Sequence, residues 1–305
     1  MLIDDVERYI ALRRSLGSEL RKPSRHLQAL ARFATEKGET HICAATAIEW
    51  ATAAPTRDAR HRRLRDVARF ARFLRAEDAA HEVPPTGLFA APVSRPAPYI
   101  YTPDELARIL ETAGQLRRQK PNPMRRQLYV TLFGLIAAAG LRVSEALNLN
   151  LGDVLPGGVL HIRETKFYKS RLVPLHATVV EALDRYLAMR RRLAAPDDHV
   201  FLSVKGKALC YTTVHYTFRR VLQLANIAPG RTRRPRIHDL RHSFATRVLE
   251  QCNTKRDAVA RHFVALATYL GHSDIAHTYW YLQATPELMT DIAAATEALI
   301  AQEAS

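Results

Sequence analysis

Cysteine is scarce in this chain of 305 residues, which contains only Cys43, Cys210 and Cys252. They lie far apart and form no Cys-x-x-Cys pair, so the sequence provides neither a disulfide framework nor a cysteine-based zinc site. The most apolar stretch, residues 128–141, is too short to cross a bilayer. The first ten residues are acidic and amphipathic, unlike a secretion signal. These absences argue against a secreted, disulfide-rich or membrane protein and predict a cytoplasmic one.

Acidic residues are also few relative to basic ones. The chain has 45 lysines and arginines against 30 aspartates and glutamates, a net charge of +15. Such an excess attracts polyanions and predicts a nucleic acid as partner. An arginine-rich composition without any such partner would give the same charge.

Proline is concentrated in one segment, residues 81–101, which we expect to be an extended linker between two domains because proline ends helices and removes strand donors. Before it, residues 1–80 show helical spacing of apolar residues and predict four helices. The fourth, over residues 56–76, carries an arginine stripe at helical spacing: Arg62, Arg65, Arg69 and Arg72. The stripe fits a phosphate backbone, and it equally fits a face that is merely solvated.

The second predicted domain, residues 102–305, opens with a helix start, in which Thr102 is the N-cap, Pro103 the first helical residue and Glu105 the partner in a capping box. An apolar helix over residues 126–139 should stop at Gly140. Two short strands, 159–162 and 171–173, are expected around a basic turn, followed by helices over 177–192, 211–225, 238–250, 256–270 and 289–302. The predicted fold is mainly α with one small antiparallel sheet.

Four segments carry polar residues that taken singly mean little. They are the runs AGLRVSE at 139–145, TKFYKSRLVPL at 165–175, HDLRHSFAT at 238–246 and LGH at 270–272, with Tyr281 nine residues after the last histidine. Together and in this order they resemble the catalytic domain of the tyrosine recombinases, the phage integrase family. The resemblance covers about two thirds of the chain, and residues 1–80 are similar, less specifically, to the core-DNA-binding domain of the family.

This resemblance implies site-specific DNA cleavage and rejoining through a 3′-phosphotyrosyl intermediate, without metal or ATP. Tyr281 would be the nucleophile, while Arg142 and Arg241 would bind the phosphate oxygens with planar guanidinium groups that stay charged. His238 and His272 would donate hydrogen bonds to the phosphate or assist deprotonation of the tyrosine, and Lys166 would protonate the leaving 5′-oxygen. The DNA-binding residues expected beside them are Arg62, Arg65, Arg69, Arg72, Lys169 and Arg171.

The family also implies a two-domain clamp around duplex DNA, a tetramer on paired sites, and docking of residues 289–302 on a neighbouring protomer. Several alternatives stay open. Tyr279 is the second choice of nucleophile, and Lys169 the second choice of general acid. His238 and His242 have the spacing of zinc ligands, but the residues between them lack the glutamate of His-Glu-x-x-His, so no metal is expected. A catalytically silent DNA-binding accessory factor and a type IB topoisomerase are the other functions considered.

Overall fold

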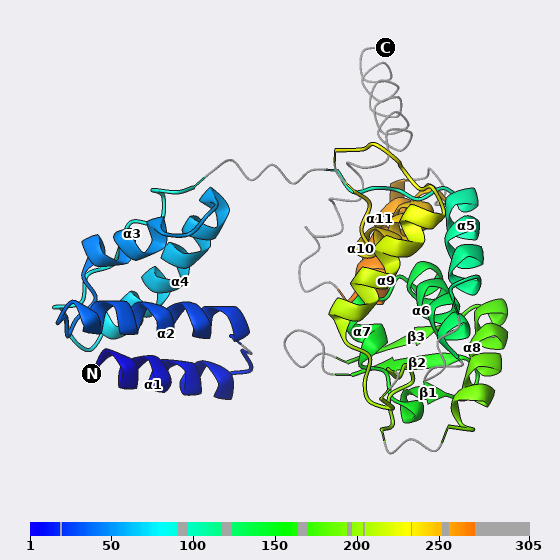
Figure 1. Cartoon of the computed structure of the whole chain (residues 1–305), viewed down its shortest axis with the longest axis horizontal. Coiled ribbons are helices and arrows are strands. Elements are labelled where there is room, and N and C mark those ends of the chain that lie inside the picture. The colour runs from blue at the N-terminus through cyan, green and yellow to red at the C-terminus, as the bar shows by residue number, and fades with distance from the viewer. Residues whose placement is uncertain are drawn as a thin grey trace, which may run out of the picture. The chain divides into compact units, whose positions relative to one another are not determined.

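The computed structural model describes residues 1–18, 20–90, 97–117, 124–163, 170–193, 197–203, 205–232, 234–251 and 256–271. The chain divides into two compact units, Met1–Arg95 and Pro96–Ser305 (Figure 1). The division falls within the proline-rich segment that the sequence predicts to be a linker. In the part of the chain that the structure describes, no helix has the length and hydropathy of a membrane span.

Within its described residues, the first unit contains the four helices that the apolar spacing predicts: α1 (Leu2–Ser15), α2 (Arg21–Glu36), α3 (Ala44–Thr52) and α4 (Arg57–Arg75). Thr56 caps α4 by accepting a hydrogen bond from the amide of Ala59. The helices share one core, in which Leu64, Phe70 and Trp50 are buried. The exposed side of α4 carries the arginines of the predicted stripe.

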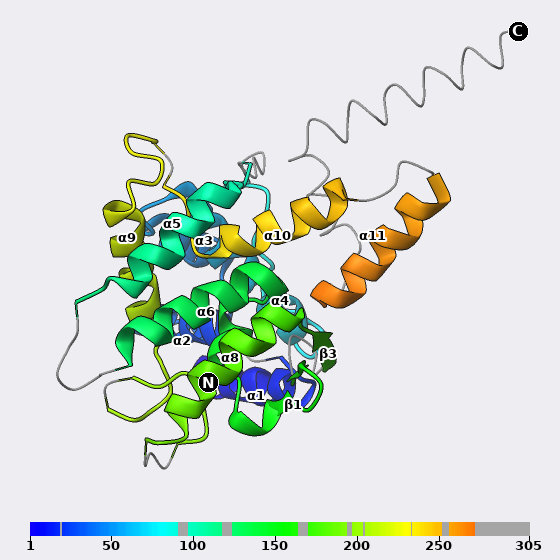
Figure 2. The ribbon, with the colours of Figure 1, turned by 90° about the vertical axis from the view of Figure 1, so that its right-hand side faces the viewer.

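The second unit is built around α6 (Arg125–Ala139), which packs against α5 (Pro103–Gly114), α8 (Ala177–Arg190) and α10 (His238–Glu250) (Figure 2). Most faces of α6 carry apolar, buried residues, among them Leu132, Phe133 and Ile136, as expected of a central helix. The helices α9 (Tyr211–Leu224) and α11 (Arg256–Leu270) pack on α5 and α10, respectively. The capping box of Thr102 and Glu105 is present at the start of α5.

The second unit also contains a small antiparallel sheet. Its strands lie in the order β1 (Val154–Leu155), β2 (Val159–Ile162) and β3 (Arg171–Pro174). In β2 and β3, Leu160 is opposite Val173 and Ile162 is opposite Arg171. Val173 is fully buried while the preceding Leu172 is exposed, the alternation of a sheet with one covered face. The strands β2 and β3 were predicted; β1 and the short α7 (Val143–Leu147) were not.

Candidate active site

The site begins where α6 ends. Gly140 has φ +59°, the left-handed conformation that closes a helix, and a Cβ there would lie 2.4 Å from the ring of Phe244. The chain therefore turns tightly and begins α7, with Arg142 at its N-cap. The Arg142 side chain is partly exposed, at 31%.

Glu145 lies at the centre of an arginine cluster that we define as Arg142, Arg171 and Arg241. The Arg142 guanidinium donates to its Oε1 at 2.6 Å, and the Arg142 amide donates to Oε2 at 2.9 Å. The Arg171 guanidinium donates to both carboxylate oxygens, at 3.0 and 2.8 Å. Burial opposes ionisation of this carboxyl group, but the hydrogen bonds and charges of Arg171 and Arg142 prevail and lower the pKa of Glu145 to about 2.

Arg241 is the most deeply buried member of the cluster, with 1% exposure. Its Nη1 donates to the carbonyl of Gly140 and its Nη2 to that of Leu270, both at 2.7 Å, and Nη1 is 3.8 Å from Glu145. It therefore joins α10 to the C-terminal ends of α6 and α11. Arg142 reaches the same turn, since its Nη2 donates to the carbonyl of Gly271 at 3.1 Å.

The start of α10 is held by its own polar contacts. Asp239, buried in the first turn, accepts from the Arg236 amide at 2.7 Å and from its guanidinium at 2.8 Å. Ser243 accepts from the amide of Tyr101 at 2.8 Å. These contacts hold the start of α10 in place. The helix carries His238 and Arg241 about one turn apart.

His238 sits at the first position of α10 with its ring 4.7 Å from that of His242, edge to face. Desolvation, and next the charge of Arg241, lower the pKa of His238 to about 4. The ring is therefore neutral at pH 7 and is able to donate one hydrogen bond as a neutral imidazole. His242 is itself buried, with 7% exposure.

The cluster has the chemistry of a phosphate site. Its three guanidiniums and one carboxylate have a net charge of two positive units. The low dielectric of the buried surroundings strengthens the electrostatic interactions of these charges. A phosphodiester carries one negative charge, which becomes two as the pentacoordinate transition state forms. A cluster with excess positive charge therefore stabilises the doubly charged transition state more than the singly charged ground state, which is the requirement for catalysis.

The structure brings together Arg142, Arg241 and His238, three residues to which the resemblance assigns catalytic roles. Glu145 was missed as a site residue, and Arg171 was predicted only as a DNA contact. Five predicted or alternative site residues lie outside the described residues: Lys166, Lys169, His272, Tyr279 and Tyr281.

Tyr269 also lies near this turn and belongs to the described residues. Its role is in packing. Its ring stacks on Phe244 at 5.7 Å, and burial raises its pKa above the ordinary value. A hydroxyl with a raised pKa is a poorer nucleophile.

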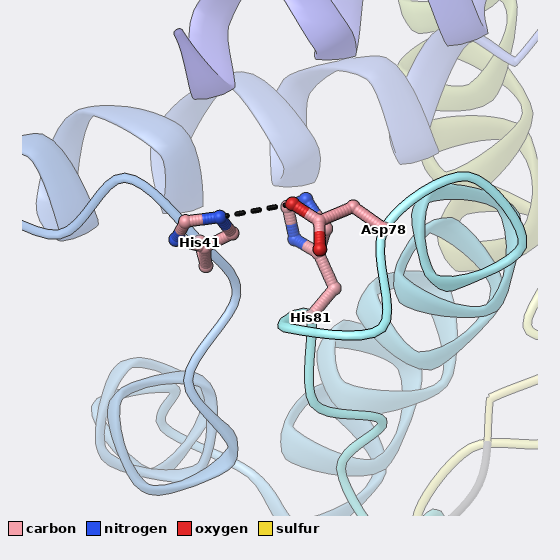
Figure 3. A group of neighbouring side chains, drawn as sticks. All are labelled: His41, Asp78 and His81. Atoms are coloured by element: carbon pink, nitrogen blue, oxygen red, sulfur yellow. Dashed lines mark hydrogen bonds and ion pairs between the residues drawn. The ribbon is translucent and has the colours of Figure 1, made fainter.

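A separate polar cluster occurs in the first unit, where His41, Asp78 and His81 face one another (Figure 3). His41 Nε2 is hydrogen-bonded to Asp78 Oδ2 at 3.0 Å. Nδ1 of the buried His81 accepts the amide of Ile42 at 3.1 Å, and burial lowers the pKa of His81. The neutral ring then carries its proton on Nε2, so it has no second lone pair for a metal. These contacts join the α2–α3 loop to the segment after α4.

A mainly helical fold with a small antiparallel sheet thus presents an arginine cluster with the excess positive charge that phosphate binding requires. The chain belongs to the phage integrase family, which matches residues 100–287. It is a site-specific tyrosine recombinase, an enzyme that cleaves and rejoins DNA.

Its relatives include a protein named integrase/recombinase y4rB from Sinorhizobium fredii (strain NBRC 101917 / NGR234), 37% identical over 294 residues and 94% of each chain. Tyrosine recombinase XerC of Actinobacillus pleuropneumoniae serotype 7 (strain AP76) is 30% identical over 202 residues, covering 65% of this chain and 58% of that one.

Among solved structures, the fold is similar to that of XerH recombinase bound to its palindromic difH substrate, with a TM-score of 0.67, 19% identity and coverage of 96% of this chain and 84% of that one. A lambda integrase tetramer bound to a Holliday junction gives a TM-score of 0.64, with 16% identity and coverage of 91% and 76%. Both likenesses confirm the predicted fold class.

Proposed function

We propose that this recombinase cleaves duplex DNA through a covalent 3′-phosphotyrosyl bond at Tyr281, without metal or ATP. The phenolic oxygen gives up its proton, to a neighbouring histidine or to water, and forms a bond to phosphorus; the bond from phosphorus to the 5′-oxygen breaks, and Lys166 gives that oxygen its proton. Because one phosphoester replaces another, a new 5′-hydroxyl rejoins the strand by the reverse reaction. The observation that supports this role most is the arginine cluster around Glu145.

Within that cluster, Arg142 is the residue proposed to bind the phosphate first, since its side chain is the more exposed of the two predicted clamps. Arg241 is proposed to bind the same phosphate, and two of its five N–H groups donate to the carbonyls of Gly140 and Leu270. Neutral His238 donates a hydrogen bond alongside them, and His272 is assigned the same kind of role by the family resemblance.

Duplex DNA is the proposed partner of both units, and the bacterial nucleoid the proposed place of action. The exposed α4 arginines of the first unit, Arg62, Arg65, Arg69 and Arg72, are proposed to follow the phosphate backbone, and Lys169 to add a contact from the second unit. Arg62 also pairs with Asp58, which leaves the other three as the stronger candidates.

A nicked suicide duplex tests the covalent step, because loss of the short cleaved strand traps the intermediate. The core site is first located by footprinting on DNA flanking the gene. The expected result is a covalent protein–DNA adduct in EDTA, absent in Tyr281→Phe and present in Tyr279→Phe, with binding unchanged in both. Binding without any adduct would contradict the proposal and indicate an accessory factor, and an adduct that required a divalent metal would also contradict it.

Assembly on paired sites as a tetramer is proposed from the family resemblance and from the tetrameric lambda integrase complex. Residues 289–302, which lie outside the described residues, are assigned to docking on a neighbouring protomer. Truncation after Thr285 should then abolish synapsis and strand exchange while leaving suicide cleavage intact. Recombination by the truncated chain at the normal rate would show that the docking assignment is wrong, and relaxation of plasmids lacking the site would indicate a topoisomerase.

A further inference from the structure

Arg171 is placed unlike a DNA-contacting arginine. It is the first residue of β3, and its side chain is only 12% exposed. Its guanidinium is engaged on both sides: Nη1 and Nη2 donate to the two oxygens of Glu145, and Nε donates to the carbonyl of Tyr269 at 2.8 Å. A planar fork that spans a carboxylate while its third nitrogen binds a carbonyl is a geometry that only arginine provides.

The contact between Arg171 and Glu145 determines how much uncompensated negative charge Arg142 faces. Glu145 is 5% exposed and accepts from Arg142 as well as from Arg171. If Arg171 were absent, the negative charge of the buried Glu145 carboxylate would be balanced by Arg142 alone. The positive charge of Arg142, the residue proposed to bind the phosphate, would then be neutralised. With Arg171 present, Glu145 orients the Arg142 guanidinium without cancelling its positive charge.

The second contact involves the turn after α11. Gly271 has φ +66°, and a Cβ at this position would lie 2.9 Å from Nη1 of Arg171, so the backbone passes directly over the guanidinium. Arg142 donates to the carbonyl of the same glycine. Arg171 therefore lies where three segments meet: the strand β3, the helix α7 that carries Glu145, and the turn at residues 269–271.

We propose that Arg171 is a positioning residue, which sets the orientation and the available charge of Arg142 through Glu145 and holds the turn at residues 269–271, rather than a residue that contacts DNA. The inference rests on the proposed role of Arg142 as a phosphate ligand. It replaces, for this residue, the DNA contact expected from the sequence.

The test compares Arg171→Gln and Arg171→Lys with Arg185→Gln, which removes one charge from an exposed position on α8. Saturating enzyme on the suicide duplex should cleave at least 30-fold more slowly in Arg171→Gln and at least tenfold more slowly in Arg171→Lys, because an ammonium cannot reach both partners. The dissociation constant should stay within threefold of the wild type, with an unchanged salt slope. Weaker binding, a salt slope reduced by about one, and a normal rate at saturation would overturn the proposal and restore the DNA contact.

A double variant tests whether the effect passes through Glu145. In the Glu145→Gln background, Arg171→Gln should slow cleavage by well under a further 30-fold, because the connection through Glu145 is already broken and only the contact with the turn at residues 269–271 is still lost. A further 30-fold loss would overturn the route through Glu145.

A measurement without DNA separates this inference from the proposed function. In protein labelled with ¹³C at glutamate carboxyls, the Glu145 signal, assigned by its loss in Glu145→Gln, should begin to titrate at a higher pH in Arg171→Gln than in the wild type or Arg185→Gln. An unchanged titration would overturn the charge compensation. Absence of a wild-type DNA adduct would instead refute the proposed function, and the titration would still decide the contact between Arg171 and Glu145.

Discussion

At the scale of single residues, Glu145 explains how three guanidiniums stay close together despite their like charge. Glu145→Gln keeps the shape of the side chain but leaves Arg171 and Arg142 facing a neutral amide. We expect the unfolding free energy to fall by about 3 kcal/mol, as for other broken buried ion pairs, and suicide cleavage to slow at least tenfold. Chemical denaturation and single-turnover cleavage measure the two effects.

The control for this variant is Glu181→Gln, which removes an exposed carboxylate from α8. It should change neither quantity measurably. An equal loss of stability in both variants would contradict the central place of Glu145, as would a Glu145→Gln enzyme with the normal cleavage rate.

His238 gives a second prediction at this scale, concerning pH. Its pKa of about 4 in the folded chain lies below the ordinary value of 6.5, so the unfolded chain takes up the proton first. The stability that neutral His238 contributes is complete above pH 6.5, and it is lost as the pH falls from 6.5 towards 4. His238→Gln should flatten this part of the curve of melting temperature against pH, whereas His262→Gln, at an exposed position on α11, should not. Parallel curves for His238→Gln and the wild type would refute the assignment.

The site residues differ in how far the sequence alone reveals them. Arg142, His238 and Arg241 are recognisable because each lies in a motif of the family. The role of Glu145 is not, since a glutamate in the first turn of a helix is ordinarily a solvated partner of the helix dipole. Only its burial between two guanidiniums, which depends on β3 and α7 meeting in space, shows that it organises the cluster.

At the scale of elements, Gly140 links the end of α6 to the site. Gly140→Ala puts a side chain in a left-handed conformation and drives its Cβ against the Phe244 ring. These two costs together should lower the stability of the second unit by about 3 kcal/mol. Gly157→Ala is the matched control, because Gly157 has φ +78° but nothing within 4 Å of its Cβ position; the expected loss is about 1 kcal/mol.

Thermal unfolding of both glycine variants measures the difference. Equal destabilisation would show that backbone strain alone acts at Gly140, and that the fit of α6 against α10 tolerates an added methyl group.

Helices and strands were predictable from the sequence where the apolar spacing repeats over a long stretch. The helices α4, α6 and α10 begin and end within about one residue of expectation, because Thr56, Gly140 and apolar spacing mark them. The strand β1, of two residues, and α7, of five, are too short for any period to appear. Yet α7 carries Glu145, so the least predictable element holds the centre of the site.

At the scale of the whole molecule, the excess of positive charge predicts how binding responds to salt. Replacing Arg65, Arg69 and Arg72 together with glutamine removes three exposed cations from one face of α4. If each neutralises a phosphate, the slope of log K against log salt should become shallower by nearly three, while the melting temperature stays the same. Filter binding over a range of salt measures the slope; an unchanged slope would mean that this face is merely solvated.

The central claim, that Tyr281 exchanges places with a sugar oxygen on phosphorus, is tested most directly by locating the covalent bond. The suicide adduct is digested with protease and nuclease, and the modified peptide is sequenced by mass spectrometry. The account predicts a nucleoside 3′-phosphate on the Tyr281 phenol. Attachment at Tyr279, at another residue, or through a 5′-phosphate would contradict it.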